Sequence, residues 1–170
     1  MKQILLMIAV VGCGKKPAEE SVFDQGRPDI TKPSKPPAKT EAQIEAETKA
    51  FAETKANAEA GGAEAQHNLG VMYYRGEGAE KDFKEAAKWW RKAADQGYAK
   101  AQNNLGVMYR DGLGVEQDYK EALKLWRKAA DQGVAEAQYN LGVMYQNGQG
   151  VEQDFKEAVK WFQKAADQGH

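Results

Sequence analysis

A 36-residue stretch that occurs three times in succession decides the fold of this chain. In the middle copy, residues 97–132, it reads GYAKAQNNLGVMYRDGLGVEQDYKEALKLWRKAADQ. The copies at 61–96 and 133–168 keep the same spacing, and 23 of the 36 positions are identical in all three. A period of this length is typical of solenoids, in which each unit packs mainly on its neighbours. The sequence therefore predicts three stacked units over 61–168.

Each copy reads as two helices separated by a glycine-rich turn. In the first copy, apolar side chains recur at helical spacing over about Glu64–Tyr74. The turn follows at Gly76–Gly78, because glycine adopts the positive φ that a sharp reversal needs. Asp82, with Glu85 three positions later, is an acidic version of the capping box and predicts the start of the second helix. Gly97 follows its last turn, where a left-handed residue is expected.

A glycine recurs in the middle of each first helix. The positions are Gly70, Gly106 and Gly142. Because a mid-helix glycine costs about 1 kcal/mol relative to alanine, its repetition predicts that a neighbouring helix comes too close for a Cβ. We expect bulky rings of the second helices to fill the space over these small residues. The rings are those of Trp90, Trp126 and Phe162.

These motifs closely resemble the Sel1-like repeat, a relative of the tetratricopeptide repeat with a longer loop. The resemblance rests on Ala65–Tyr73, Gly76–Gly78 and Ala87–Ala94 and on their two echoes, and it covers about two thirds of the chain. It implies an all-α fold, an α/α right-handed solenoid of three helix-turn-helix repeats. It also implies work as an adaptor or scaffold.

In the related tetratricopeptide fold, the first helix of each repeat lines a concave groove for a partner. Matching by position from Leu69-Gly70 carries this role to five residues of each copy. They are Glu64, His67, Val71, Tyr74, Arg75, Lys100, Asn103, Val107, Arg110, Asp111, Glu136, Tyr139, Val143, Gln146 and Asn147. Apart from the valines, the copies differ at these positions. Either a surface shaped for an irregular partner or the drift of exposed residues would produce such differences. Tyr and Arg are common hot-spot residues, so a peptide or protein partner is expected.

The composition argues against several other functions. The chain has 24 Lys and Arg against 25 Asp and Glu, a balance that disfavours nucleic-acid binding. Two His and one Cys do not make a metal cage, so we expect no metal and no cofactor. The serines, Ser21 and Ser34, both precede the repeats, and helix capping accounts for the paired carboxylates. We therefore expect no enzyme, with a cell-wall-related, β-lactamase-like hydrolase as the alternative.

The start of the chain has the features of a secretion signal followed by a site of membrane attachment. Ile4–Val11 is apolar but too short to cross a bilayer as a helix. Val10-Val11-Gly12-Cys13 resembles the lipobox of bacterial lipoproteins, the alternative being an ordinary signal peptide with an incidental Cys. The resemblance implies a signal peptide over 1–12, acyl chains such as palmitate at Cys13, and a membrane anchor in the cell envelope. Gly14 favours the outer membrane, on its periplasmic face, if the source is Gram-negative.

Two further segments precede the repeats. Residues 13–39 hold all five prolines and few apolar side chains, which predicts a disordered tether. Residues 40–60 lack Gly and Pro and predict a charged Ala/Glu/Lys helix, which either caps the repeats or continues the tether. At the other end, the last helix, with Trp161 and Phe162, has no following unit to cover it. Self-association through the solenoid ends is therefore a further expectation.

Overall fold

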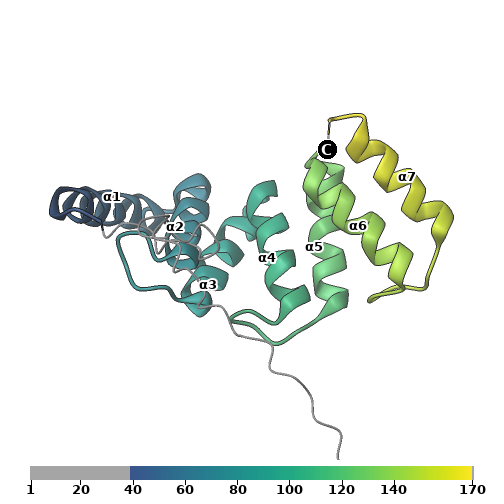
Figure 1. The fold of residues 1–170 in the computed structure, drawn as a ribbon, viewed down its shortest axis with the longest axis horizontal. Helices are drawn as coiled ribbons and strands as arrows, with labels where there is room; N and C mark the ends of the chain where they lie inside the picture. The colour runs from purple at the N-terminus through teal and green to yellow at the C-terminus, as the bar shows by residue number, and fades with distance from the viewer. Residues whose placement is uncertain (1–38, 170) are drawn as a thin grey trace, which may run out of the picture. The chain divides into compact units, whose positions relative to one another are not determined.

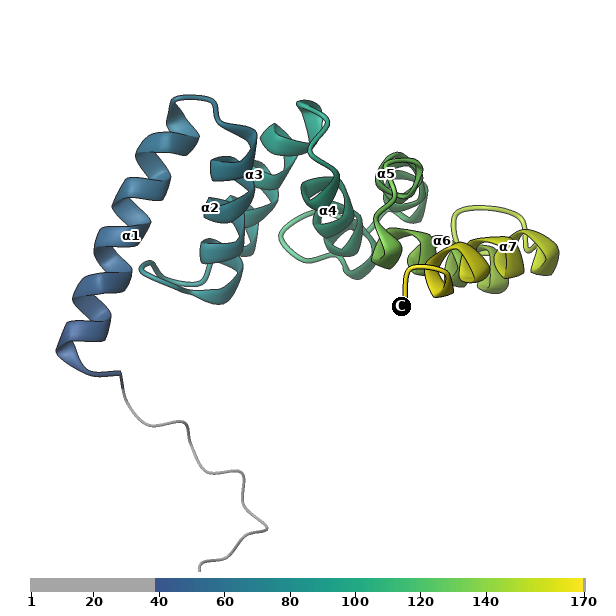
Figure 2. The same cartoon turned by 90° about the horizontal axis from the view of Figure 1, so that it is seen from above.

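The computed structural model describes residues 39–169, so the predicted signal peptide, Cys13 and nearly all of the predicted tether lie outside the described residues. Within this range the chain forms seven helices and no strand. They are α1 (Glu41–Glu59), α2 (Ala63–Arg75), α3 (Phe83–Asp95), α4 (Ala99–Asp111), α5 (Tyr119–Asp131), α6 (Ala135–Asn147) and α7 (Phe155–Ala166). Figures 1 and 2 show them following one another along the domain in chain order. The predicted all-α solenoid is confirmed.

Each 36-residue unit is a helical hairpin. The closest packing joins α2 to α3, α4 to α5 and α6 to α7, and the hairpins meet where α3 packs on α4 and α5 packs on α6. None of the seven helices is both long enough and apolar enough to span a membrane.

The spacing inside each hairpin is set by an aromatic ring that lies directly on a glycine. A Cβ built on Gly70 would lie 2.5 Å from the Trp90 indole. The same contact recurs between Gly106 and Trp126 and between Gly142 and Phe162. The Trp90 Nε1–H also donates to the carbonyl of His67 at 3.0 Å, which holds the ring in this orientation. The predicted close approach is confirmed, and its partner is the second helix of the same unit.

The second helix of each unit begins at an aspartate, but the predicted capping box is only half formed. Asp82 Oδ1 accepts from the backbone N–H of Lys84 at 2.8 Å and of Glu85 at 3.1 Å. The reciprocal bond is absent because the Asp82 N–H donates to the carbonyl of Tyr73 at 2.9 Å. Glu85 instead accepts from Lys88 at 2.9 Å. The same exchange occurs at Asp118 and Asp154, whose N–H groups donate to Tyr109 and Tyr145.

A buried glutamine joins each unit to the helix before it. Gln102 is 3% exposed, and its Nε2 donates to the carbonyl of Ala94 at 3.2 Å. Its Oε1 accepts from Nε2 of Gln132 at 2.9 Å. The other two units repeat this with Gln66 between Ala58 and Gln96, and with Gln138 between Ala130 and Gln168. We call this arrangement the glutamine junction.

α1 occupies the place that the second helix of a preceding unit would take. Its Ala58 carbonyl accepts the junction bond from Gln66, and Ala58 is 1% exposed. Gly78, at φ +72°, lies against the backbone of Glu47 and against Phe51. The second unit meets α3 in the same way, through Gly114 on the backbone of Phe83. α1 therefore packs on the first repeat with the contacts that repeats use among themselves.

The outer face of α7 is the least covered apolar surface in the described residues. Phe155 and Val159 are 61% and 64% exposed, whereas the matching residues of α3 and α5 are covered by the next unit. The expectation that Trp161 would be uncovered is wrong. Trp161 is 4% exposed because it joins the core formed by α5, α6 and α7, with the Arg127 guanidinium over its ring. Phe162 is half-buried over Gly142.

Candidate partner-binding groove

Two connected hollows lie along the first helices of the three units. The smaller, the apolar hollow, has a volume of about 210 Å³ and is lined by Val71, Tyr74, Arg75, Trp90, Asn104, Val107 and Met108. The larger, the polar hollow, has a volume of about 700 Å³ and is lined by His67, Val71, Arg75, Lys100, Asn103, Asn104, Gly133, Val134, Ala135, Glu136 and Gln168. Val71, Arg75 and Asn104 belong to both, so the hollows are continuous. We refer to the two together as the groove.

The structure brings part of the predicted set of groove residues together. Those that line a hollow are His67, Val71, Tyr74, Arg75, Lys100, Asn103, Val107 and Glu136. The others lie outside both hollows, on α2, α4 and α6: Glu64, Arg110, Asp111, Tyr139, Val143, Gln146 and Asn147. The groove thus runs from the end of α2 across α4 to the start of α6.

Sequence reasoning missed several of the lining residues. Trp90 was expected only in the core, yet it also forms the floor of the apolar hollow together with Met108. Asn104 was not singled out, although it borders both hollows. The sequence signal that could have identified it is an Asn that is identical in all three copies and directly follows a groove position that varies. Such a constant polar residue beside the partner surface indicates a structural hydrogen bond.

The floor of the apolar hollow is built from rings. Trp90 is 4% exposed, and the Tyr74 ring lies against it with centroids 5.5 Å apart. Tyr74 also contacts Phe83, at 5.3 Å between centroids, so that α3 supports the Tyr74 side chain from below. A concave apolar surface with a few polar groups at its edge is typical of ligand sites. This hollow is large enough for one bulky side chain.

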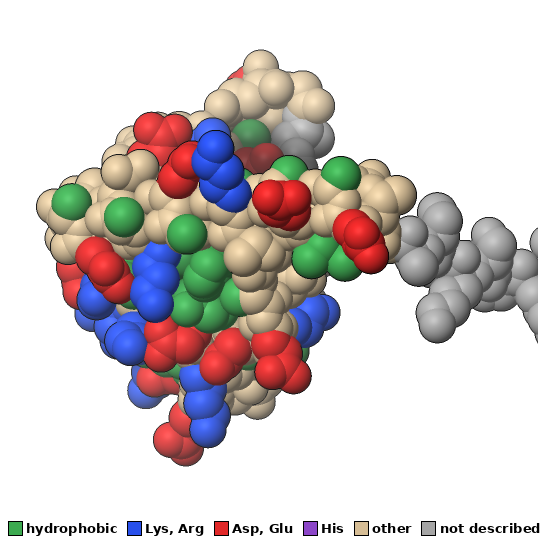
Figure 3. Space-filling view, turned by 90° about the vertical axis from the view of Figure 1, so that its left-hand side faces the viewer, with side chains coloured by type: hydrophobic (Ala, Val, Ile, Leu, Met, Phe, Trp, Pro, Cys, Tyr) green, Lys and Arg blue, Asp and Glu red, His purple; other side chains and the backbone are tan. Residues whose placement is uncertain are grey.

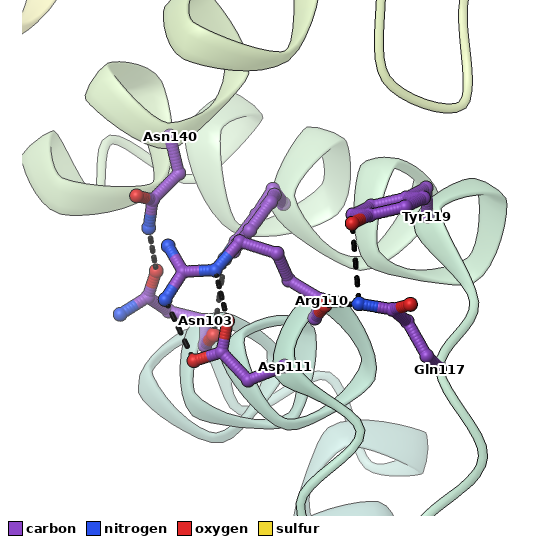
Figure 4. A network of polar contacts seen from close by, with 7 residues as sticks. Asn103, Arg110, Asp111, Gln117, Tyr119 and Asn140 are labelled. Carbon is purple, nitrogen blue, oxygen red and sulfur yellow. Dashed lines mark hydrogen bonds and ion pairs between the residues drawn. The ribbon is translucent and has the colours of Figure 1, made fainter.

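A ladder of amide hydrogen bonds crosses the groove from one first helix to the next. Asn104 Nδ2 donates to Nε2 of His67 at 3.1 Å, and Asn140 Nδ2 donates to Oδ1 of Asn103 at 3.3 Å. Figure 4 shows the second of these bonds beside the Arg110–Asp111 pair. His67 and Asn103, predicted as contacts for a partner, therefore also tie neighbouring units together.

His67 is buried rather than solvated. It is 9% exposed, and its ring centroid lies 6.5 Å from that of Trp90 and 5.2 Å from that of Tyr98. Its Nε2 accepts from Asn104, so the proton of the neutral ring is on Nδ1 and is donated to Oδ1 of Asn68 at 3.2 Å. Burial lowers the pKa of His67 below its ordinary value, and the bond to Asn68 opposes this in part. The ring is therefore neutral at pH 7.

The cations in the groove and beside it differ in how well carboxylates neutralise their charge. Arg110 forms two hydrogen bonds with Asp111, at 2.6 and 2.8 Å, and this pairing lowers the pKa of the Asp111 carboxyl (Figure 4). Arg75 is 64% exposed and meets Glu77 only at 3.6 Å. Lys100 has no ion pair within 4.0 Å among residues 39–169. The groove thus presents two weakly neutralised cations, with Glu136 at its far end.

The repeat pattern identifies the family of this chain. The family model described as the Sel1 repeat matches residues 63–98, 99–134 and 135–170. The chain belongs to the Sel1 repeat family. The matched units begin two residues later than the copies as read from the sequence, at the first residues of α2, α4 and α6. Sel1 repeat proteins are generally protein-interaction scaffolds and are typically non-catalytic.

Solved structures of similar proteins support the fold. A protective antigen of uropathogenic Escherichia coli with an SLR fold is 48% identical, with a TM-score of 0.68, over 71% of this chain and 26% of that one. A Sel1 repeat protein from Oxalobacter formigenes is 40% identical, with a TM-score of 0.69, over 72% of this chain and 51% of that one. This chain thus spans about a quarter and about half of these two relatives.

A more distant likeness concerns the fold alone. Cysteine rich protein B from Helicobacter pylori is 22% identical, with a TM-score of 0.58, over 72% of this chain and 91% of that one. None of the curated proteins matches the chain at a significant level. Among the described residues, no group of His, Cys, Asp and Glu side chains is arranged to hold a metal ion.

Proposed function

We propose that this Sel1 repeat protein is a non-catalytic scaffold that holds a peptide or protein segment in the groove formed by α2, α4 and α6. The observation that carries the proposal is the apolar hollow between α2 and α4, with Trp90 and Met108 at its floor. It opens into the polar hollow, where amides and charged groups are available for orientation. No pairing of a nucleophile with a base among the described groove residues favours the hydrolase alternative.

The groove is tested by crosslinking in cells. A photo-crosslinking residue placed at Tyr74 or at Val107 should form an adduct with a defined partner, identified by mass spectrometry. The same residue at Lys84 or Lys120, on the exposed starts of α3 and α5, is the control and should not. Arg75→Ala, tested with the crosslinker at Val107, should weaken the adduct while helicity is unchanged. Equal adducts from groove and control positions would place the partner elsewhere.

We also propose that lipid on Cys13 anchors the protein to the membrane of the cell envelope, the outer membrane in a Gram-negative source. Support comes from Val10-Val11-Gly12-Cys13 alone. Two or three acyl chains would hold the protein stably, because each buried methylene adds about 0.8 kcal/mol. Mass spectrometry of the amino-terminal peptide should find acyl chains on Cys13. Cys13→Ser should release the protein from membranes, and retention of this variant would contradict the anchor.

A second candidate function is self-association through α7, favoured by the exposed Phe155 and Val159. The opposite end, at α1, carries both acidic and basic side chains around a small apolar area (Figure 3). Such a charged surface disfavours head-to-tail stacking on the apolar face of α7. An α7 face would therefore meet the α7 face of a second copy, in an isologous contact. Sedimentation should show a concentration-dependent dimer that Val159→Glu abolishes. A monomer at all concentrations would contradict it.

A further inference from the structure

The charge of the groove is not repeated from unit to unit. Lys100 stands where the other two copies have Glu64 and Glu136. Arg75 stands where the other copies have Asp111 and Asn147. The two substitutions bring basic residues to the same hollow, from the end of α2 and the start of α4. The stretch between the first and second units is therefore the basic part of an otherwise balanced surface.

Both cations remain available to a partner. Arg75 borders the apolar and the polar hollow, is largely exposed, and has only the loose contact with Glu77. Lys100 lines the polar hollow with no carboxylate within ion-pair distance among the described residues. Arg110 one unit further on differs, because Asp111 neutralises it through two hydrogen bonds. Cations beside a concave apolar wall attract carboxylates, since the field is focused there.

The neighbouring hollow is suited to an apolar group. Its volume of about 210 Å³ lies over Trp90 and Met108 and between Val71 and Val107. Burying one Leu or Phe side chain there would favour binding, because apolar surface is removed from water. Among the polar side chains at its edge, Asn104 already has its Nδ2 engaged by His67, and Arg75 is the cation shared with the polar hollow. The rest of the wall is formed by Val71, Trp90, Val107 and Met108, so the hollow suits an apolar side chain.

From these two features we propose that the groove selects an extended acidic segment with one bulky apolar side chain. The apolar side chain fills the hollow between α2 and α4, and carboxylates beside it meet Arg75 and Lys100. Glu136, at the far end of the polar hollow, repels carboxylates and so confines them to the α2 side. This inference rests on the proposed function, because it concerns the same groove, and it adds the chemistry of the occupant.

The test uses the full chain and fluorescence anisotropy with three labelled peptides. They are acetyl-Glu-Asp-Ala-Phe-Glu-Asp, its neutral counterpart acetyl-Gln-Asn-Ala-Phe-Gln-Asn, and acetyl-Glu-Asp-Ala-Ala-Glu-Asp without the ring. The first should bind at least tenfold more tightly than either of the others. Its affinity should fall with added salt, as expected for exposed charge pairs.

Protein variants locate the binding. Lys100→Glu and Arg75→Asn introduce residues that other copies have at these positions. Each should lower the affinity for the acidic peptide about three- to tenfold. Lys84→Glu makes the same charge change as Lys100→Glu on α3, outside both hollows, and should leave the affinity unchanged. Equal losses in all three variants would show a general charge effect and overturn the inference.

The remaining outcomes separate this inference from the proposed function. Equal binding of the neutral and acidic peptides, lost in Val107→Arg, would overturn the acidic preference and leave the groove as a binding site. Binding of none of the three peptides would also overturn the inference. In that case the crosslinks at Tyr74 and Val107 would still decide whether a partner uses the groove.

Discussion

One absent methyl group sets the distance between the two helices of each unit. At Gly106 the Cβ of any other residue would lie 2.7 Å from the Trp126 indole, closer than real contacts allow. Glycine at this position destabilises the helix by about 1 kcal/mol relative to alanine, but it allows this close approach. Trp126 is 1% exposed, so its ring cannot turn outward to relieve a clash. A larger residue at position 106 must therefore disturb the packing between the two helices of the hairpin.

The first prediction follows from this contact. Gly106→Ala should destabilise the domain by about 1–3 kcal/mol in urea unfolding, although alanine favours the helix, because overpacking outweighs propensity. Adding Trp126→Leu should recover part of the stability lost by the alanine, which a double-mutant cycle would detect. A neutral or stabilising Gly106→Ala would show that the ring moves freely.

The second prediction concerns His67, whose neutral ring is held by Asn68 and Asn104. Burial and the Lys100 charge lower its pKa in the folded chain, while Glu64 and the bond to Asn68 oppose this. In the unfolded chain the group titrates near its ordinary value of about 6.5, so below that pH the unfolded chain binds more protons. This contribution to the free energy of unfolding should be complete above about pH 6.5. It should be lost as the pH falls from there through the lower folded pKa.

The matched variant for this test is His67→Asn, which copies the residue at Asn103. Urea unfolding of both proteins between pH 7.5 and 5 should show a steeper loss of stability in the parent. An identical slope would mean that His67 titrates normally in the folded protein.

At the scale of elements, the glutamine junction connects helices that the turns alone do not align. The Gln102 side chain donates to a carbonyl near the end of α3 and accepts from the side chain of Gln132, which directly follows α5. The Ala94 carbonyl lies in buried surface, where an unpaired polar group costs about 1–3 kcal/mol. The junction therefore fixes how one hairpin sits on the next.

The third prediction tests this junction. Gln102→Met keeps the volume but leaves the Ala94 carbonyl and the Gln132 amide without their partner. It should lower the free energy of unfolding by about 2 kcal/mol. Gln132→Ala leaves the bond to Ala94 intact and removes, at an exposed position, the bonds from Gln132 to Gln102 and to the Lys128 carbonyl. It should cost less than about 1 kcal/mol. Equal costs would show that the bond to Ala94 is not the important one.

The elements themselves could be predicted from the sequence because their signals are local. Helical spacing, the glycine turns and the aspartate starts each involve residues close together in the chain. The glutamine junction, the burial of His67 and the bond from the Asp82 N–H to the Tyr73 carbonyl depend on residues 9 to 37 positions apart. Gln102 is one of the positions identical in all three copies, but identity alone does not say which carbonyl its side chain meets. The groove was predicted only in part because the curvature decides which first-helix positions face one another.

At the scale of the whole domain, stability is a sum over neighbouring units, and the two ends differ. α1 covers the first unit, whereas α7 leaves Phe155 and Val159 exposed. In such an array, cooperativity passes only between adjacent hairpins. The less covered end is therefore expected to open first.

The fourth prediction is a gradient of amide hydrogen exchange. Amides of α7 should exchange faster than those of α4 and α5, and removal of residues 1–60 should raise exchange in α2 and α3 more than in α6. The same truncation should lower the free energy of unfolding, because Leu69 and Gln66 lose their cover. Uniform protection across α2–α7 would show that the domain opens as one unit.

The likeness between α1 and the second helix of a repeat bears on how such a chain can change its length. Every boundary, including the first, is made by the same amide reaching a carbonyl and the same loop pressing on a backbone. A copied block of 36 codons inserted at any of these boundaries would meet neighbours already shaped to receive it. Duplication or loss of whole blocks can thus lengthen or shorten the array while the leading helix stays unaltered. The length of the array then becomes a heritable variable that can change without redesign of any single boundary.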